Sequence, residues 1–356
     1  MARIVQMPQL PEQVAVGQGG RVDTVGLNGD ALLLAAGLTR SRPWLPRRER
    51  FMFRGGSSGH HLGMRSLRAA EAAVDRVERA KALDPAVTAA KKAVDAALPS
   101  APLRDALHGV WLGHPLHPAL ILVPLGSWIS ATVLDFLPGS RRGAQALVGL
   151  GVLAAVPTAA AGAADWSDLH PQQQRIGLVH ALANTVTVGL QVASWRSRRR
   201  GRHARGVTLS LAAVSVGGIA AYLGGHLAYR QAAGMNHAEE APYTLPEEFT
   251  RLCSLEDLPD GRPVRMALAD GPVFVLRRDR RVDVLYHECS HLGGPLSEGE
   301  LSGSGDELCV QCPWHGSVFR IRDGEVRRGP TTHPQPVLEV VVDPDGTVRA
   351  RLREDG

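Results

Sequence analysis

The sequence predicts a chain with two folded parts, an all-α bundle of four membrane-spanning helices followed by an all-β domain. Four apolar blocks lie between residues 118 and 229, and each approaches the roughly 20 residues that a helix needs to cross a bilayer. After these blocks the pattern changes to short apolar runs around charged or Asp-Gly turns, which is typical of antiparallel strands. A chain of 356 residues has room for both parts and for additional segments.

The N-terminal part is expected to contain a disordered segment and then two amphipathic helices. Residues 1–63 have little apolar periodicity and are rich in Gly, Arg and Pro, so we expect disorder there, with Met64 as an alternative start. The Arg pair of "PRRER" is not followed by the apolar run of a twin-arginine signal. Residues 64–102 are Ala-rich with one apolar face, and Asp84-Pro85 is typical of a helix start. We expect these helices to pack on a neighbour, and binding to a lipid surface is the alternative.

The four apolar blocks predict a transmembrane domain over residues 103–232. The blocks are residues 118–137, 143–164, 176–195 and 206–229. Their Gly, Ala, Ser and Thr content suits close packing of helices in lipid. The second block is the weakest, because Pro157 and its alanine tail dilute it. A buried soluble bundle is the alternative, and four consecutive blocks with short connections argue against it.

The basic charge of the chain reports membrane topology. The formal net charge is +5 and the pI is about 9.3, which would also suit a nucleic-acid partner. However, the arginines gather in two connections on one side of the membrane, at residues 141–142 and in "RSRRRGRHAR" (196–205). The positive-inside rule makes these connections cytoplasmic. We therefore expect the lipid bilayer and no nucleic acid as partner, and an extracytoplasmic all-β domain.

The last part of the chain predicts a small β domain after a polar linker over residues 233–247. Three β-hairpins are expected within residues 248–356, in the segments 271–288, 317–329 and 337–352. Between the second and third cysteines of this part lies "SEGELSGSGDE" (297–307), which we expect to extend a surface loop.

Two short motifs in this part supply ligands for a metal centre. They are Cys289-Ser-His291 and Cys312-Pro-Trp-His315. Two thiolates and two imidazoles suit a structural zinc ion. They also suit a two-iron cluster with two cysteines on one iron and two histidines on the other. A Cys309–Cys312 redox dithiol would compete with such a centre. We expect Cys309 and Cys253 to be small core residues, and His287 and His333 to be surface or strand residues.

The residues around these motifs resemble the Rieske [2Fe–2S] family. The resemblance covers roughly residues 248–352 and includes Cys-x-His-Leu-Gly-Gly-Pro-Leu and Cys-Pro-Trp-His-Gly-Ser. It implies a [2Fe–2S] cluster held by Cys289, His291, Cys312 and His315, and it favours the cluster over zinc. Four further residues are expected to shape or tune the surroundings of the cluster, namely Gly293, Gly294, Trp314 and Ser317.

Departures from one branch of that family indicate another branch. Rieske proteins of quinol-oxidising complexes have two additional cysteines that form a disulfide, and Gly294 and Trp314 stand at the corresponding positions here. Those proteins also hydrogen-bond the cluster with a serine and a tyrosine. Ser317 is kept, but Phe319 replaces the tyrosine. The resemblance therefore implies the ferredoxin-like branch and a lower reduction potential.

The membrane part resembles an uncharacterised bacterial family of four-helix membrane proteins, which implies a multi-pass protein of the bacterial cell membrane. The resemblance rests on "LHGVWLGHPLHPALILVPLGSW", Asp165-Trp166 and "GLVHALAN". Alternating spans place one set of polar residues near the end of the bundle from which the β domain follows, namely His114, His117, Asp165, Asp168, His170, His180 and His226. One hypothesis is a haem b or quinone site formed by His114, His117, His180 and His226. The alternative is hydrogen bonding between helices.

These observations favour a membrane-anchored electron carrier that has no catalytic site of its own. It would pass single electrons between a membrane donor, quinol or haem, and an unknown partner. Only 41 residues follow His315, too few for a mononuclear iron domain, so an oxygenase role would need another chain. The alternatives are therefore the electron-supplying component of a multi-chain oxygenase, and an iron- or redox-sensing membrane protein.

Overall fold

The computed structural model describes residues 70–353, all within one compact unit. The expected disorder of residues 1–63 lies outside these residues. The described chain begins with a helix over 70–79 and a 3-10 turn, η1 (Lys81–Leu83). Two helices and a second 3-10 turn follow, α2 (Asp84–Ala97), α3 (Ala101–His108) and η2 (Val110–Leu112).

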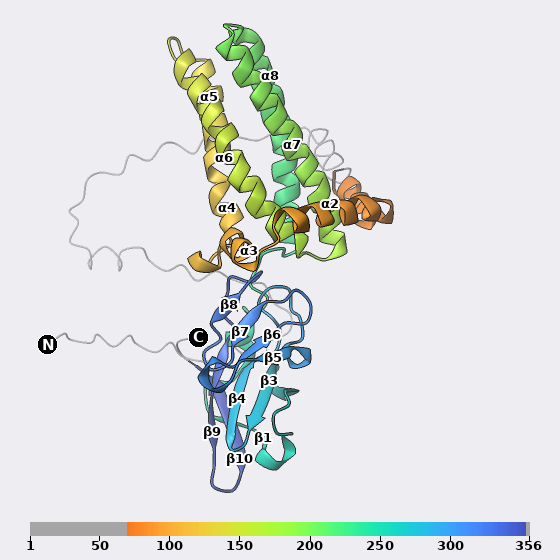
Figure 1. Cartoon of the computed structure of the whole chain (residues 1–356), viewed down its shortest axis with the longest axis vertical. Coiled ribbons are helices and arrows are strands. Elements are labelled where there is room, and N and C mark those ends of the chain that lie inside the picture. Colours follow the sequence, from red (N-terminus) through yellow and green to blue (C-terminus); the bar gives the residue numbers. More distant parts are fainter. Residues whose placement is uncertain (1–69, 354–356) are drawn as a thin grey trace, which may run out of the picture. The chain divides into compact units, whose positions relative to one another are not determined.

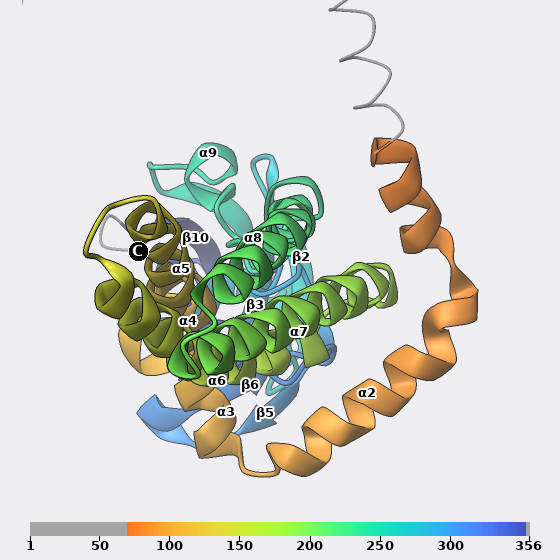
Figure 2. The same ribbon diagram turned by 90° about the horizontal axis from the view of Figure 1, so that it is seen from above.

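Helix α2 packs against two of the long helices, as expected for an amphipathic helix with a neighbour. Figures 1 and 2 show α2 running across the direction of the long helices. The ammonium of Lys91 donates a hydrogen bond to the Ser167 carbonyl at 2.5 Å. The guanidinium of Arg175 forms two hydrogen bonds with the Asp84 carboxylate, at 2.6 and 3.1 Å. Polar contacts and the buried Val87 therefore hold α2 on the bundle.

Four helices are long and apolar enough to cross a membrane. They are Leu116–Asp135, formed by α4 (Leu116–Leu120) and α5 (Leu122–Asp135), then α6 (Arg141–Ser167) and α7 (Pro171–Arg199), and finally His203–Arg230, formed by α8 (His203–Gly225) and the π-helical turn η3 (His226–Arg230). Pro157 lies inside α6, and the helix continues on both sides of it to a total length of 27 residues. The expected second block is thus one unbroken helix.

The packing of these helices is that of a membrane domain. Small side chains lie inside, and Ala144, Ala161 and Ala164 are fully buried. Large aliphatic side chains face outward, and Leu153 is 72% exposed. A Cβ added at Gly151 would come within 2.3 Å of the Trp128 ring nitrogen, so glycine lets the indole lie against the α6 backbone. Small residues at helix contacts and apolar residues outside favour lipid as the surroundings.

The C-terminal part consists of two antiparallel sheets (Figure 1). The six-stranded sheet has the order β1-β10-β9-β4-β3-β2, and its strands are β1 (Thr250–Ser254), β2 (Val264–Leu268), β3 (Gly271–Arg278), β4 (Arg281–Tyr286), β9 (Val337–Val342) and β10 (Thr347–Leu352). The four-stranded sheet has the order β5-β6-β7-β8, and its strands are β5 (Glu300–Ser302), β6 (Cys309–Gln311), β7 (Val318–Arg320) and β8 (Val326–Arg328). The expected hairpins are present as the pairs β3–β4, β7–β8 and β9–β10.

Two segments differ from the expectation. The insert 297–307 contains β5, which pairs with β6 in a register that sets Ser302 opposite Cys309, so it extends a sheet. The expected linker contains α9 (Ala241–Thr244), and Ala238, Ala241 and Leu245 are buried in the core of the six-stranded sheet. Small and apolar side chains in this otherwise polar stretch fill space beside the strands, which a free linker would not do.

The two sheets enclose a core that reaches the candidate ligands. This core contains Phe274, Leu285 and Phe319 together with Cys289 and Cys312. The two cysteines therefore lie at the end of a packed apolar core, and the turns that carry them start from buried strands.

Candidate metal centre

The two candidate ligand motifs form two similar turns. In the first, which we call the first ligand turn (289–294), the Cys289 N–H donates to the Gly294 carbonyl at 2.9 Å and the Gly293 N–H donates to the Cys289 carbonyl at 2.8 Å. In the second ligand turn (312–317), the Cys312 N–H donates to the Ser317 carbonyl at 2.8 Å and the Gly316 N–H donates to the Cys312 carbonyl at 3.1 Å. Each turn thus returns on itself and presents a cysteine and a histidine together.

The structure brings the four predicted ligands into one place. Cys289 and Cys312 are 1% and 2% exposed, His291 is buried, and His315 is half-buried. The imidazoles of His291 and His315 meet edge to face, with ring centroids 5.0 Å apart. The two thiols are close enough for each to shift the pKa of the other. Each turn therefore contributes one member to a thiol pair and one to an imidazole pair.

The protonation states suit metal binding. The neighbouring Cys312 thiol and burial raise the pKa of Cys289, and the neighbouring Cys289 thiol lowers the pKa of Cys312 to about 7. The Cys312 thiolate is thus accessible near neutral pH. Burial and the neighbouring His315 lower the pKa of His291 to about 3, and burial also lowers the pKa of His315. Both imidazoles are neutral at pH 7, the form that ligates metals.

The residues fit a two-iron cluster. The Nδ1 atom of His291 is buried and has no hydrogen-bond partner, which is costly unless another group binds it. No group of three or more His, Cys, Asp or Glu side chains within residues 70–353 is arranged around a single metal ion. A [2Fe–2S] cluster does not need such a group, because each iron takes only two protein ligands.

The four expected tuning residues lie around the ligands. A Cβ added at Gly294 would come within 2.6 Å of the Cys312 sulfur, so the first ligand turn passes directly over that thiol. Gly293 has a φ of +73°, which favours glycine. The Ser317 hydroxyl accepts the Thr331 N–H at 3.2 Å, and its proximity lowers the pKa of Cys289. Trp314 is 50% exposed and contacts His170 of the membrane part, with ring centroids 5.5 Å apart.

A buried glutamine that the sequence reasoning missed holds the first ligand turn. Gln335 is 2% exposed. Its amide donates to the Tyr286 and Glu288 carbonyls at 2.8 and 2.7 Å, and its oxygen accepts the Ser290 N–H at 3.1 Å. Ser290 also hydrogen-bonds Thr331 at 2.8 Å. No spacing rule connects residue 335 to residue 290, so only the fold reveals this support.

The remaining cysteines and histidines of this part are largely as expected. Cys253 and Cys309 are buried and free, which confirms them as core residues. His333 is half-buried. His287, however, is only 4% exposed because it directly follows β4 and enters the core, so a surface position was the wrong expectation.

Each of the four membrane histidines has its own surroundings in the structure. His117 hydrogen-bonds the Thr158 carbonyl at 2.9 Å, and His180 hydrogen-bonds the Ala220 carbonyl at 2.8 Å. His226 is buried with an unpartnered Nε2, and His114 contacts His333. Contacts between helices account for His117 and His180, as the alternative expectation stated.

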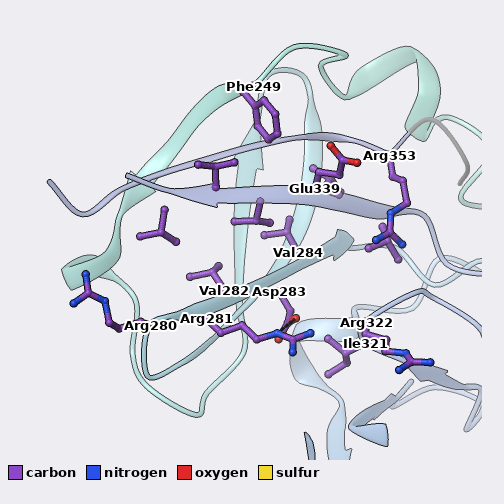
Figure 3. Close-up of a pocket in the computed structure, with 15 residues that line it drawn as sticks. Phe249, Arg280, Arg281, Val282, Asp283, Val284, Ile321, Arg322, Glu339 and Arg353 are labelled. Atoms are coloured by element: carbon purple, nitrogen blue, oxygen red, sulfur yellow. Dashed lines mark hydrogen bonds and ion pairs between the residues drawn. The ribbon is translucent and has the colours of Figure 1, made fainter. Parts of the chain in front are cut away.

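A wide groove elsewhere on the β part is separate from the ligands. Strands β4 and β9 pair only at Val284–Leu338 and Leu285–Val337, and they diverge beyond these positions. The groove that opens there has a volume of about 600 Å³, with Arg280, Arg281, Arg322 and Arg353 around a floor of valines (Figure 3). It contains none of the four candidate ligands.

Comparison with protein families divides the chain into two known modules. Residues 248–341 match the model described as Rieske [2Fe-2S] domain, and residues 113–237 match the model described as Predicted membrane protein (DUF2231). These matches agree with both resemblances found in the sequence.

Individual relatives match the β part of the chain. Apoptosis-inducing factor 3 of Mus musculus is 31% identical over 122 residues, which are 32% of this chain and 20% of that protein. The chain thus spans about a fifth of that relative's length. The 3-phenylpropionate/cinnamic acid dioxygenase ferredoxin subunit of Photorhabdus laumondii is 30% identical over 104 residues, which are 29% of this chain and 94% of that protein.

One similar solved structure is the ferredoxin of carbazole 1,9a-dioxygenase from Nocardioides aromaticivorans IC177. It is 26% identical and covers 30% of this chain and 98% of that chain, with a TM-score of 0.27. The family assignment depends on the sequence matches.

Proposed function

Because this chain belongs to the Rieske [2Fe–2S] family, we propose that it is a membrane-anchored electron-transfer protein that links a membrane donor to a partner. The proposed ligands are Cys289, His291, Cys312 and His315. The observation that carries the proposal is the meeting of two thiols and two neutral imidazoles at two turns, one imidazole with an orphaned buried nitrogen. When bound, the cluster would supply reversible one-electron chemistry, at a potential raised by its histidine ligands.

The residues of the chain prepare this site in distinct ways. The core below Cys289 and Cys312 keeps water from the thiols. Gln335 and Ser290 fix the first ligand turn. The Ser317 hydroxyl lies beside Cys289, and a hydrogen bond from it to sulfur would raise the potential of a cluster.

The topology of the protein is part of the proposal. The arginine-rich connections at 141–142 and 196–205 lie at the opposite ends of the long helices from residues 113–116 and 168–170. The positive-inside rule then supports an extracytoplasmic Rieske domain. We further propose the domain limits 64–102, 103–232 and 248–356, with residues 238–245 packed on the last domain. A protease-accessibility assay at the C terminus tests the sidedness.

The identity of the donor is a separate proposal. A haem b or a quinone near His114, His117, His180 and His226 would place a donor in the bundle. A purified protein with a Soret band, or with co-purified quinone, would support this site. Absence of both would remove it and leave the electron-carrier function standing.

The electron-supplying component of an oxygenase is the second candidate function. The observation that favours it is the similarity of residues in this chain to a dioxygenase ferredoxin subunit, 94% of which is covered. Reconstitution of oxygen-dependent turnover with a separate oxygenase chain would support it. A sensor role predicts a phenotype that depends on cluster oxidation state without electron flow.

The decisive experiment is EPR spectroscopy of the reduced full-length protein in detergent, with a redox titration. A rhombic [2Fe–2S] signal is expected, and stoichiometric zinc without that signal would contradict the proposal. Cys312→Ser should abolish the signal. Cys309→Ser is a matched control, because Cys309 is also buried and lies three residues away. It should retain the signal. His291→Cys or His315→Cys should lower the potential or lose the cluster.

A further inference from the structure

The ligand turns and the segment that follows β8 contact the end of the membrane bundle at several points. The Gly329 N–H donates to the Asp105 carboxylate at 2.8 Å, and the His237 N–H donates to the Ser290 carbonyl at 2.9 Å. His170, immediately before α7, lies edge-on to the candidate ligand His315, with ring centroids 5.4 Å apart. The imidazole face of the site is therefore covered by this chain's own membrane domain.

A charged cluster lies at this end of the bundle, and we call it the acidic seat. Its members are His108, Asp165 and Asp168, with Arg104 beside them. The His108 ring contacts the Asp165 carboxylate at 2.8 Å and the Asp168 carboxylate at 3.4 Å. Arg104 lies 3.8 Å from Asp168. His108 is 2% exposed and lies between two carboxylates. Although burial lowers the pKa of His108, these carboxylates raise it to about 9, so the ring is a cation at neutral pH.

The acidic seat is close to the candidate ligands. A small cavity of about 40 Å³ is lined by His108 and Asp165 on one side and by His291, Ser290 and residues 330–333 on the other. Asp168 contacts the His108 ring at 3.4 Å, and it lies two residues before His170, whose ring is edge-on to His315. The seat thus adjoins His291 across this cavity, and it approaches His315 through His170.

We propose that the acidic seat of the membrane domain sets the reduction potential of the cluster when the Rieske domain is docked on the bundle. This inference rests on the proposed function, and it makes Asp168 and His108 positioning residues for electron transfer. Reduction adds a negative charge to the cluster. A nearby carboxylate therefore disfavours reduction, and a nearby imidazolium favours it. Burial strengthens both effects, because the seat is poorly screened by water.

The opposite charges in the acidic seat predict opposite shifts of the reduction potential, which a purely structural role of these residues would not produce. Asp168→Asn keeps the shape and removes a negative charge, so the potential should rise. The expected shift is about tenfold in the reduction equilibrium, equivalent to about 59 mV for one electron. His108→Gln removes a positive charge, so the potential should fall. Loss of packing alone would not shift the two variants in opposite directions.

Further variants control for folding and for charge in general. Asp165→Asn should raise the potential as Asp168→Asn does, so the test survives if one variant fails to fold. Asp168→Glu keeps the negative charge, so its reduction potential should equal that of the wild type. Asp343→Asn is the matched control: it removes the same charge from a carboxylate that pairs with Arg349 on the β9–β10 hairpin. It should leave the potential unchanged.

The last experiment weakens the contact between the Rieske domain and the membrane bundle. Asp105→Ala removes the acceptor of the Gly329 N–H, which should weaken docking. If the seat acts only in the docked state, the shift from Asp168→Asn should shrink in the Asp105→Ala background, as a double-mutant cycle measures. EPR-monitored titrations of full-length variants in nanodiscs give all these potentials. Equal potentials in all variants that retain the cluster would overturn the inference alone, whereas a wild-type protein without a cluster would overturn the proposed function.

Discussion

The two ligand turns have the same hydrogen-bond plan but different surroundings. The first ligand turn lies in the interior of the β domain, where its Ser290 is fully buried and is held by Gln335 and Thr331. The second ligand turn is more exposed, and the rings of its Trp314 and His315 make edge-to-face contacts with His170 of the membrane domain. The difference teaches that side chains of the β domain fix the backbone of the first ligand turn, whereas the exposed side chains of the second ligand turn depend on a contact with the membrane domain.

The largest effect is expected from removing the support of the first ligand turn. Gln335→Ala leaves two carbonyls and one N–H buried without partners, so we expect a loss of about 3–5 kcal/mol in unfolding free energy. The cluster signal should fall with it. Thermal unfolding and EPR intensity measure both. Gln311→Ala, at a half-buried strand position, is the control, and an equal loss there would remove the special role of Gln335.

The next effect concerns the membrane side of the site, where His108 lies beside His291. Burial works to lower the pKa of His108, but Asp165 and Asp168 raise it to about 9 from an ordinary 6.5. A raised pKa contributes stability that is full below pH 6.5 and is lost as the pH rises through 9. We expect a loss of up to about 3 kcal/mol across that window. Thermal midpoints between pH 6 and 10 measure it.

The control for this prediction is the same pH series on His108→Gln. That variant should be less stable at pH 6 and should lack the decrease between pH 6.5 and 9. If its pH profile matches that of the wild type, the decrease comes from another group.

A smaller effect is expected from substituting the two glycines of the first ligand turn, and the two substitutions should differ in their effect on cluster occupancy. Gly294→Ala would place a Cβ 2.6 Å from the Cys312 sulfur, so the turns must move apart and cluster occupancy should fall by at least half. Gly293→Ala meets no atom within 4 Å and adds only the strain of a positive φ, about 1 kcal/mol. Iron content and thermal midpoints distinguish the two. Equal occupancy in both variants would show that the close approach is unimportant.

The smallest effect is expected at the exposed edge of the second ligand turn. Trp314→Ala removes an edge-to-face contact with His170, which is worth about 1 kcal/mol. Stability should change little, but His315 should react faster with diethylpyrocarbonate because its surroundings open. Trp111→Ala, at a 69% exposed tryptophan, is a suitable control, and faster reaction in that variant would contradict a local effect.

The sequence by itself determined the two fold classes, the four apolar spans and the identity of the candidate ligands. Each of these depends on local information: runs of apolar residues, turn residues between strands, and the types of residue within a short motif. The same local reasoning missed β5 and the packing of residues 238–245, because a Gly- and Ser-rich insert and a polar stretch resemble loops until a sheet edge or a core surface lies beside them.

Only the tertiary structure decided what surrounds the ligands. Gln335 lies 45 residues from the Ser290 N–H that it accepts, and Asp105 lies 224 residues from the Gly329 N–H. The sequence placed Asp165, Asp168 and His170 at one end of the bundle, but it gave no reason to join them with His108 or to set them beside His291 and His315. Motif spacing specifies which atoms can bind a cluster. The burial and charges that govern their chemistry come from residues that only folding brings near.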